Sequence, residues 1–369
     1  MFIWYYPRIT IQGNNPYDNL VTYKNYILNV YQDAIASKAL NIFRQRHIDT
    51  LQSPFQPLSV GLDANEYEFF ESDKVKYKQY YDALVQAFND FKVKEYKTLN
   101  VLVVGAGRGP LIECAFKASK VININIKLTA IEKNKCAIIS LQELAKKVPF
   151  VVVNDDIRTW VSTLSFDVIL SELLGSFGDN ELSPECLNGA QRLLSQYGVF
   201  IPCKYSSYLQ PVSCEKIWCC ARNFKEHSPL EVPYVINIQS AHFFSDPKKA
   251  FEFVHPNNTS NKRHNKLIFN NEKCDIVIHG FVGYFDAILY KEYRTSTVPG
   301  MSTPEISTWN PIYFPITTPL IVRNNEDIII NIWRTHNDTK VWYEWNVIVN
   351  KNQGVIHNVN GRCFSMSLH

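Results

Sequence analysis

The sequence predicts an α/β domain with a parallel sheet, followed by an antiparallel β domain. Between residues 98 and 200, short apolar runs alternate with helix-like segments, a spacing typical of βαβ units. From about residue 200, short runs rich in Tyr, Val, Ile, Phe and Trp, such as DIIINIWR (327–334), are punctuated by Pro, Asn and Gly and lack helical periodicity. That second texture favours a β-sandwich or β-barrel.

The elements follow in order along the chain. Residues 17–92 have helical periodicity, interrupted by the proline-containing loop 51–62. We therefore expect a helical N-terminal segment (1–60), an α/β domain (61–200) and a β domain (201–369). Within the α/β domain we expect strands at 99–104, 127–131, 150–153 and 166–172, with helices at 111–119 and 136–147.

Composition places the chain among soluble globular proteins. Hydrophobic residues make up 46% and charged residues 20%, and a formal net charge of +3 gives no argument for direct nucleic-acid binding. The nine cysteines form no C-x-x-C pair, so no metal is expected, and Cys219 and Cys220 are interpreted as buried thiols. The apolar N-terminus breaks at Pro7, too early to form an anchor, so we expect no membrane contact and a cytoplasmic and nuclear location.

A glycine-rich turn follows the first expected strand. In VLVVGAGRGP (101–110), Gly105, Gly107 and Gly109 allow close approach of the backbone to a ligand, just before a helix N-terminus. Alone, this pattern also fits an ordinary strand-to-helix turn. Glu132, at the end of the next strand, suits a ribose diol, and Asp156 lies where an acceptor for an adenine amino group is expected. A helix N-cap is the plain alternative for Asp156.

A pair of carboxylates follows the fourth expected strand. Glu172 and Glu181 are nine residues apart with Gly175 and Gly178 between them, so a hairpin could bring both side chains to one place. Two such charges are costly together unless a cation joins them, and a guanidinium matches carboxylates in bidentate geometry. Solvated loop residues, or a glycosidase acid/base pair, are the alternatives, although the second gives no reason for the glycine-rich turn.

Three segments together resemble a known family: GAGRGPL (105–111), AIEKN (130–134) and SELLGSFGDNELSPECLNGAQ (171–191). They are similar to the protein arginine methyltransferases, most closely to the fifth, symmetric (type II) member. The resemblance runs from about residue 20 to the C-terminus. It implies a Rossmann-like S-adenosylmethionine-dependent methyltransferase domain followed by a β-barrel, with methyl transfer to arginine in histones and arginine/glycine-rich RNA-binding proteins.

The resemblance also implies roles for single residues. Glu172 and Glu181 match the double-glutamate loop that grips the substrate arginine. Phe70 matches the aromatic residue that marks symmetric product specificity, and Trp309 resembles the tryptophan that stacks on the guanidinium, although simple packing is an alternative for both. Cofactor contacts are implied for Tyr67, Lys76, Tyr77, Gly105, Gly107, Glu132, Asp156 and Ile157.

Two features differ from the family pattern. The residues before the methyltransferase domain are too few for the family's N-terminal TIM barrel, which needs about 250 residues. Because that barrel recruits a WD-repeat partner, we expect no such partner here, and a monomer or homodimer as the assembly. In GMSTPEISTWNP (300–311), which looks longer than the family loop, Asn310 replaces an expected aromatic residue.

Other functions fit the residues less well. A non-catalytic binding module would have no chemical need for Glu172, Glu181 and Glu132 together. An enzyme that stops at monomethylarginine is a second alternative within the class, whereas Phe70 argues against the asymmetric product. A small-molecule methyltransferase would leave the glutamate loop without a role.

Overall fold

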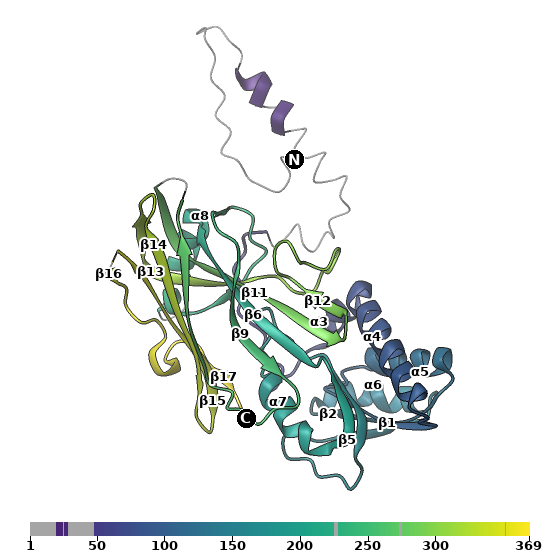
Figure 1. Cartoon of the computed structure of the whole chain (residues 1–369). Helices are drawn as coiled ribbons and strands as arrows, with labels where there is room; N and C mark the ends of the chain where they lie inside the picture. Colours follow the sequence, from purple (N-terminus) through teal and green to yellow (C-terminus); the bar gives the residue numbers. More distant parts are fainter. Residues whose placement is uncertain (1–19, 25, 29–47, 225–227, 273–274, 351) are drawn as a thin grey trace.

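The computed structural model describes residues 20–24, 26–28, 48–224, 228–272, 275–350 and 352–369. Figure 1 shows helices α4, α5 and α6 grouped with β1 and β2 at one end of the molecule, while the antiparallel strands fill the rest. The predicted order, an α/β unit followed by a β-rich unit, is therefore present in the structure.

The α/β unit is built on a parallel sheet with strand order β3-β2-β1-β4-β5. The apolar run of β1 is buried in the middle, as expected for a parallel sheet covered on both faces. Because the order reverses between β1 and β4, the carboxyl ends of these strands border a natural ligand crevice. The bounds are β1 Thr98–Val104, β2 Asn125–Glu132, β3 Val151–Asn154, β4 Phe166–Ser171 and β5 Leu194–Ile201.

The helices of this unit begin at residues that suit helix starts. Asp63 and Glu66 form a capping box for α3, the Asp73 and Asn134 side chains cap α4 and α6, and α5 begins with Pro110. The bounds are α3 Ala64–Glu71, α4 Lys74–Val93, α5 Pro110–Ile122, α6 Lys135–Ala145, α7 Ser183–Ala190 and the 3-10 helix η1 Gln191–Leu193.

The β-rich unit consists of two antiparallel sheets. One has strand order β7-β13-β11-β6-β8 with β9 and β12 at its edges, and the other has order β10-β14-β15-β16 with β17 paired to β15. The bounds in the first sheet are β6 Lys204–Ser213, β7 Tyr234–Val235, β8 His242–Phe243, β9 Lys248–Val254, β11 Ile276–Tyr290, β12 Tyr293–Ser296 and β13 Ile312–Val322. Those in the second are β10 Arg263–Asn270, β14 Asp327–His336, β15 Lys340–Val349, β16 Asn352–Gln353 and β17 Met366–Ser367.

The β-rich unit also contains short helices, and two cysteines on one of them differ from their predicted burial. They are α8 Glu215–Arg222 and the 3-10 helices η2 Pro229–Glu231 and η3 Val359–Gly361. Cys219 and Cys220 on α8 are exposed, so their interpretation as buried thiols is wrong. The reason is helical periodicity: α8 buries the face that carries Ile217, Trp218 and Ala221, and the two cysteines lie outside it.

Only part of the predicted helical N-terminal segment lies within the described residues. Residues 20–24 and 26–28 are helical, whereas 1–19 and 29–47 lie outside the described residues, as does the apolar N-terminus. Of the helices in the described ranges, none is both long and apolar enough to span a bilayer.

Candidate functional site

One pocket lies at the carboxyl edge of the parallel sheet, and it brings the predicted site residues together. Its wall includes the turn after β1, the ends of β2 and β4, and a segment of the β-rich unit. Of the twelve predicted site residues, all but Lys76 line it: Tyr67, Phe70, Tyr77, Gly105, Gly107, Glu132, Asp156, Ile157, Glu172, Glu181 and Trp309. Residues as far apart in the sequence as 67 and 309 therefore line one cavity. Its place is the carboxyl edge of the parallel sheet, where the strand order reverses and a crevice forms.

The turn after β1 requires glycine at positions 105 and 107. Gly105 and Gly107 have φ angles of 64° and 54°, a left-handed conformation that suits glycine. A Cβ atom on Gly105 would lie 2.5 Å from the Leu173 side chain, and one on Gly107 would lie 3.1 Å from the Tyr67 ring. The turn therefore leaves no room for side chains where the backbone faces the pocket.

Glu132 is held by this turn. Its Oε2 accepts a hydrogen bond of 2.8 Å from the Gly107 amide, and its Oε1 accepts one of 2.7 Å from the Asn134 amide. Burial raises the pKa of this carboxyl group, because the charged form is poorly solvated there. Each oxygen has a further lone pair, so a carboxylate fixed in this way can still accept hydrogen bonds from two hydroxyl groups.

Tyr67 and Asp156 line the pocket together with Glu132. The Tyr67 hydroxyl accepts a hydrogen bond of 3.2 Å from the Asn134 amide group, and burial raises the Tyr67 pKa. The Asp156 carboxylate pairs with the Arg158 guanidinium at 2.6 Å. Burial alone would raise the Asp156 pKa, but the contacts with Arg158 and Lys133 outweigh it and lower that pKa to about 2. Asp156 is thus ionised in the pocket wall.

The glutamate loop is a tight hairpin. Gly175 and Gly178 pair with each other, the Gly178 amide donating to the Gly175 carbonyl at 2.8 Å. The Asn180 side chain accepts a hydrogen bond of 2.6 Å from the Phe177 amide and closes the turn. As the glycine spacing predicts, Glu172 and Glu181 line the same pocket from the two ends of this hairpin.

The electrostatics of the pair favour a cationic guest. Burial and the negative charge of Glu172 raise the pKa of Glu181 well above its usual range, while the Lys76 ammonium opposes that rise. Two half-buried carboxylates so close together can both be charged at little cost only if positive charge compensates them. This site therefore suits a ligand that carries a cation.

Lys76 supplies such a cation from within the protein. Its fully buried ammonium lies 2.9 Å from Glu172 Oε2. Three aromatic rings surround it, with ring centroids 5.3 Å away at Phe70 and 5.0 Å away at both Tyr77 and Trp309. Aromatic faces attract cations at such distances. Lys76 therefore contacts Glu172 of the glutamate pair, a contact that sequence reasoning did not anticipate.

Trp309 is held in place by a hydrogen bond of its own side chain and by hydrogen bonds of the two residues before it. Its indole Nε1 donates a hydrogen bond of 2.7 Å to the Leu174 carbonyl of the glutamate loop. Just before it in the chain, the amides of Ser307 and Thr308 donate to Asp73 Oδ2 at 2.7 and 3.0 Å. Asp73 also caps α4, so one carboxylate joins the two units of the molecule. Sequence analysis missed Asp73, whose only signal was its place before a helical pattern.

Comparisons with known proteins agree with this geometry. The family model described as PRMT5 arginine-N-methyltransferase matches residues 38–201, and the model described as PRMT5 oligomerisation domain matches residues 204–366. The protein arginine N-methyltransferase 5 of Xenopus laevis is 39% identical over 98% of this chain, and the skb1 methyltransferase of Schizosaccharomyces pombe is 35% identical over 98%. The chain spans 59% and 63% of the lengths of these two relatives.

Solved structures agree in fold. The Arabidopsis thaliana protein arginine methyltransferase 10 superposes with a TM-score of 0.64 at 16% identity, over 82% of this chain and 97% of that one. A Trypanosoma brucei PRMT1 enzyme–prozyme complex with AdoHcy gives a TM-score of 0.63, also at 16% identity, over 80% of this chain and 96% of that one. The predicted fold class, a methyltransferase-type α/β unit followed by an antiparallel β-rich unit, is confirmed.

Proposed function

Because the chain belongs to the PRMT5 arginine-N-methyltransferase family, we propose that it is an S-adenosylmethionine-dependent protein arginine N-methyltransferase of type II. Its products are monomethylarginine and symmetric dimethylarginine. The substrates are basic or arginine/glycine-rich protein segments, such as those of histones and RNA-binding proteins. One observation carries the proposal: Glu172 and Glu181 line the same pocket as Glu132 and the glycine turn.

The glycine-turn end of the pocket suits the cofactor. When bound, S-adenosylmethionine supplies an electrophilic methyl group on a sulfonium centre. Glu132, already oriented by two backbone amides, would accept hydrogen bonds from the ribose hydroxyls. The Tyr67 ring packs beside Gly107, and Asp156 and Ile157 line the same pocket, where they would contact the adenine. The complex of the Trypanosoma neighbour with AdoHcy supports the same cofactor class.

The glutamate end suits a guanidinium. A free guanidinium is a poor nucleophile, since its lone pairs are delocalised over three nitrogens. Glu172 and Glu181 would bind two of its edges through charge-assisted hydrogen bonds. They would draw positive charge away from the attacking nitrogen and fix that nitrogen in line with the methyl group, and such positioning supplies much of the rate. Phe70 and Trp309 offer aromatic faces to the same cation.

The assembly and the location belong to the same proposal. The match of residues 204–366 to an oligomerisation domain supports self-association, and we take a homodimer as the simplest form. The absence of a WD-repeat partner and a location in the cytoplasm and nucleus stay predictions from the sequence.

The decisive test is direct. The chain is incubated with S-adenosylmethionine and an arginine/glycine-rich peptide, and mass spectrometry with fragmentation separates symmetric from asymmetric dimethylarginine. We expect symmetric product. Glu172→Gln and Glu181→Gln should each lose at least ten- to a hundredfold in turnover, because a charge-assisted hydrogen bond contributes about 1.5–3 kcal/mol.

Two results would count against the proposal. If the wild-type chain binds S-adenosylmethionine but methylates no arginine, it is a binding module. If both glutamine variants keep more than half of the activity, the pair does not activate the guanidinium. Calorimetry with S-adenosylmethionine serves as the control, since both variants should bind it normally.

A further inference from the structure

A buried arginine of the β-rich unit lies directly behind the glutamate loop. Arg334, on β14, is fully buried. Its Nε lies 2.6 Å from Asp179 Oδ2, and its two terminal nitrogens lie 2.9 and 2.8 Å from the oxygens of Glu185. One guanidinium thus binds two carboxylates, one of them in bidentate geometry, the arrangement for which its planar fork is suited.

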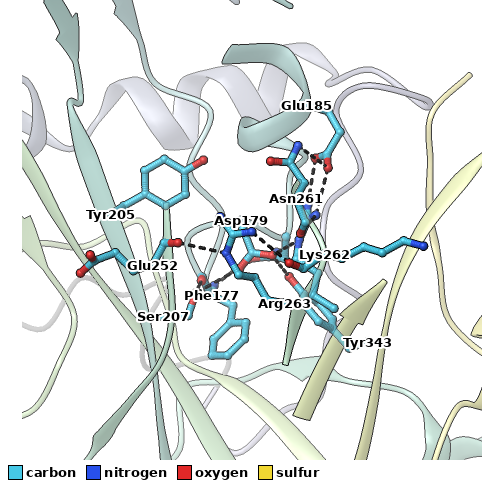
Figure 2. Close-up of polar contacts among 12 residues, drawn as sticks. Phe177, Asp179, Glu185, Tyr205, Ser207, Glu252, Asn261, Lys262, Arg263 and Tyr343 are labelled. Atoms are coloured by element: carbon cyan, nitrogen blue, oxygen red, sulfur yellow. Dashed lines mark hydrogen bonds and ion pairs between the residues drawn. The ribbon is translucent and has the colours of Figure 1, made fainter. Parts of the chain in front are cut away.

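Other strands of the β-rich unit also contact Asp179. The Tyr343 hydroxyl, on β15, donates to Asp179 Oδ2 at 2.6 Å, and the Ser207 hydroxyl, on β6, lies 3.0 Å from Oδ1. Figure 2 shows Ser207, Tyr343 and Glu185 arranged around Asp179 from separate elements. Asp179 has no exposed surface. Its position is therefore fixed by two different sheets.

The two carboxylates that bind Arg334 lie on either side of Glu181 in the sequence. Asp179 precedes it by two residues, and Glu185 follows it by four, within the first turn of α7. Among the residues that the structure describes, none donates a hydrogen bond to the Glu181 carboxylate itself. The direction of that side chain is therefore set by the backbone on either side of it, and Arg334 contacts both sides.

Burial makes this link stiff. Burial alone would lower the pKa of Arg334, but the charges of Glu185 and Asp179 raise it well above its usual range. Arg334 therefore stays charged. If it left the two carboxylates, two fully buried charges, its own and that of Asp179, would lose their partners in an apolar interior. The loop that carries Glu181 is thus tied to the β-rich unit by charge as well as by geometry.

We propose that Arg334 is a positioning residue for Glu181. By binding Asp179 and Glu185 it holds the loop so that Glu181 faces the pocket, and it couples the β-rich unit to the chemistry of the α/β unit. This role rests on the proposed methyltransferase function. Arg334 touches neither substrate nor cofactor, because it lies behind the loop and does not line the pocket.

The test compares Arg334→Lys with a matched control in the full chain. Lysine keeps the charge but loses the planar fork, so it cannot bind both carboxylates in the same way. The control is Asn346→Ala, which removes a buried side chain bonded to Asn331 across the same two strands, away from the loop. Both variants are compared at a temperature at which thermal scans find them folded.

We expect Arg334→Lys to lower kcat at least tenfold, to change the peptide KM by a smaller factor, and to leave S-adenosylmethionine affinity within twofold. Amide hydrogen exchange across residues 175–182 should become at least tenfold faster. Asn346→Ala should leave kcat and the exchange of this loop unchanged. If both variants lose stability alike and Arg334→Lys keeps normal kcat and loop exchange, Arg334 is only structural and the proposal is wrong.

Two further comparisons apply if Arg334→Lys does not fold or if the wild-type chain is inactive. If Arg334→Lys does not fold, Tyr343→Phe, which removes a single hydroxyl from Asp179, should lower kcat about three- to tenfold and speed loop exchange, and no change in either would overturn the proposal. If the wild-type chain has no transferase activity, the proposed function fails, but loop exchange in the same variants still tests the link between Arg334 and the loop.

Discussion

The ammonium of Lys76 lies 2.9 Å from the carboxylate of Glu172, inside a ring of three aromatic side chains. A carboxylate and aromatic faces are what a substrate guanidinium would also need. Lys76 thus supplies part of the positive charge that the glutamate pair requires. Its side chain can reach this place because α4 presents it, fully buried, toward the end of β4.

Lys76→Met should change the pH dependence of the enzyme. The Lys76 charge lowers the pKa of Glu181, so its removal should raise that pKa further. Glu181 must be ionised to bind a guanidinium, so the rise of kcat/KM on the acid side should move to higher pH. A pH–rate profile measures this shift. Lys78→Met, which removes an exposed lysine of the same helix paired with Asp82, should leave the profile in place.

Glu181→Gln should make the protein more stable while it removes activity. Burial raises the pKa of Glu181 in the folded protein, so its favourable contribution is complete below the unfolded value of about 4.3 and is lost as pH rises through the folded pKa. Glutamine avoids this loss. Thermal scans should find a melting temperature about 2 °C or more above that of wild type near pH 8, for ~1 kcal/mol, and a smaller difference near pH 5. Equal melting temperatures at both pH values would contradict a poorly solvated, charged Glu181 in the folded protein.

Glu132→Ala should weaken S-adenosylmethionine binding. The ribose hydroxyls would lose a charged acceptor worth about 1.5–3 kcal/mol, which corresponds to about ten- to a hundredfold in Kd. Calorimetry measures the change. Glu143→Ala, which removes an exposed glutamate on α6 paired with Lys146, should bind normally. Unchanged affinity in Glu132→Ala would mean that the cofactor binds elsewhere.

The sequence predicted those parts of the site that depend on local patterns. Gly105 and Glu132 follow buried strands, and parallel strands bring their carboxyl ends to one edge. The glycines between Glu172 and Glu181 predicted the hairpin. The comparisons confirm the family resemblance on which the remaining assignments rest.

Contacts between distant segments could not be predicted in this way. Asp73 binds Thr308 across 235 residues, and Arg334 binds Asp179 across 155 residues. An aspartate before a helix looks like a simple N-cap. The alternation of β14 places Arg334 on the buried face with Ile330 and Ile332, but it does not indicate which carboxylates the guanidinium meets. Only the packing of the β-rich unit against the glutamate loop gives either side chain its second role.

Phe70→Met should alter which nitrogen receives the second methyl group. Phe70 lines the pocket, packs edge-on against Phe55 with ring centroids 5.5 Å apart, and lies 5.3 Å from the Lys76 ammonium. After one transfer, monomethylarginine can rebind with either terminal nitrogen toward the cofactor. A rigid ring at this position restricts the space beside the reacting nitrogen and disfavours the pose that presents the methylated one.

Methionine is flexible and can yield to that second pose. A difference of only about 1.4 kcal/mol between the two poses changes their ratio tenfold, so we expect asymmetric dimethylarginine to appear beside the symmetric product, as measured by mass spectrometry with fragmentation. Phe69→Met, at the neighbouring ring on α3, is the matched control and should keep the wild-type product. If Phe70 only packs the helix, its variant will lose stability or rate with the product unchanged. An active Phe70→Met enzyme that makes only the symmetric product would therefore refute the role in product choice, while the methyltransferase proposal would stand.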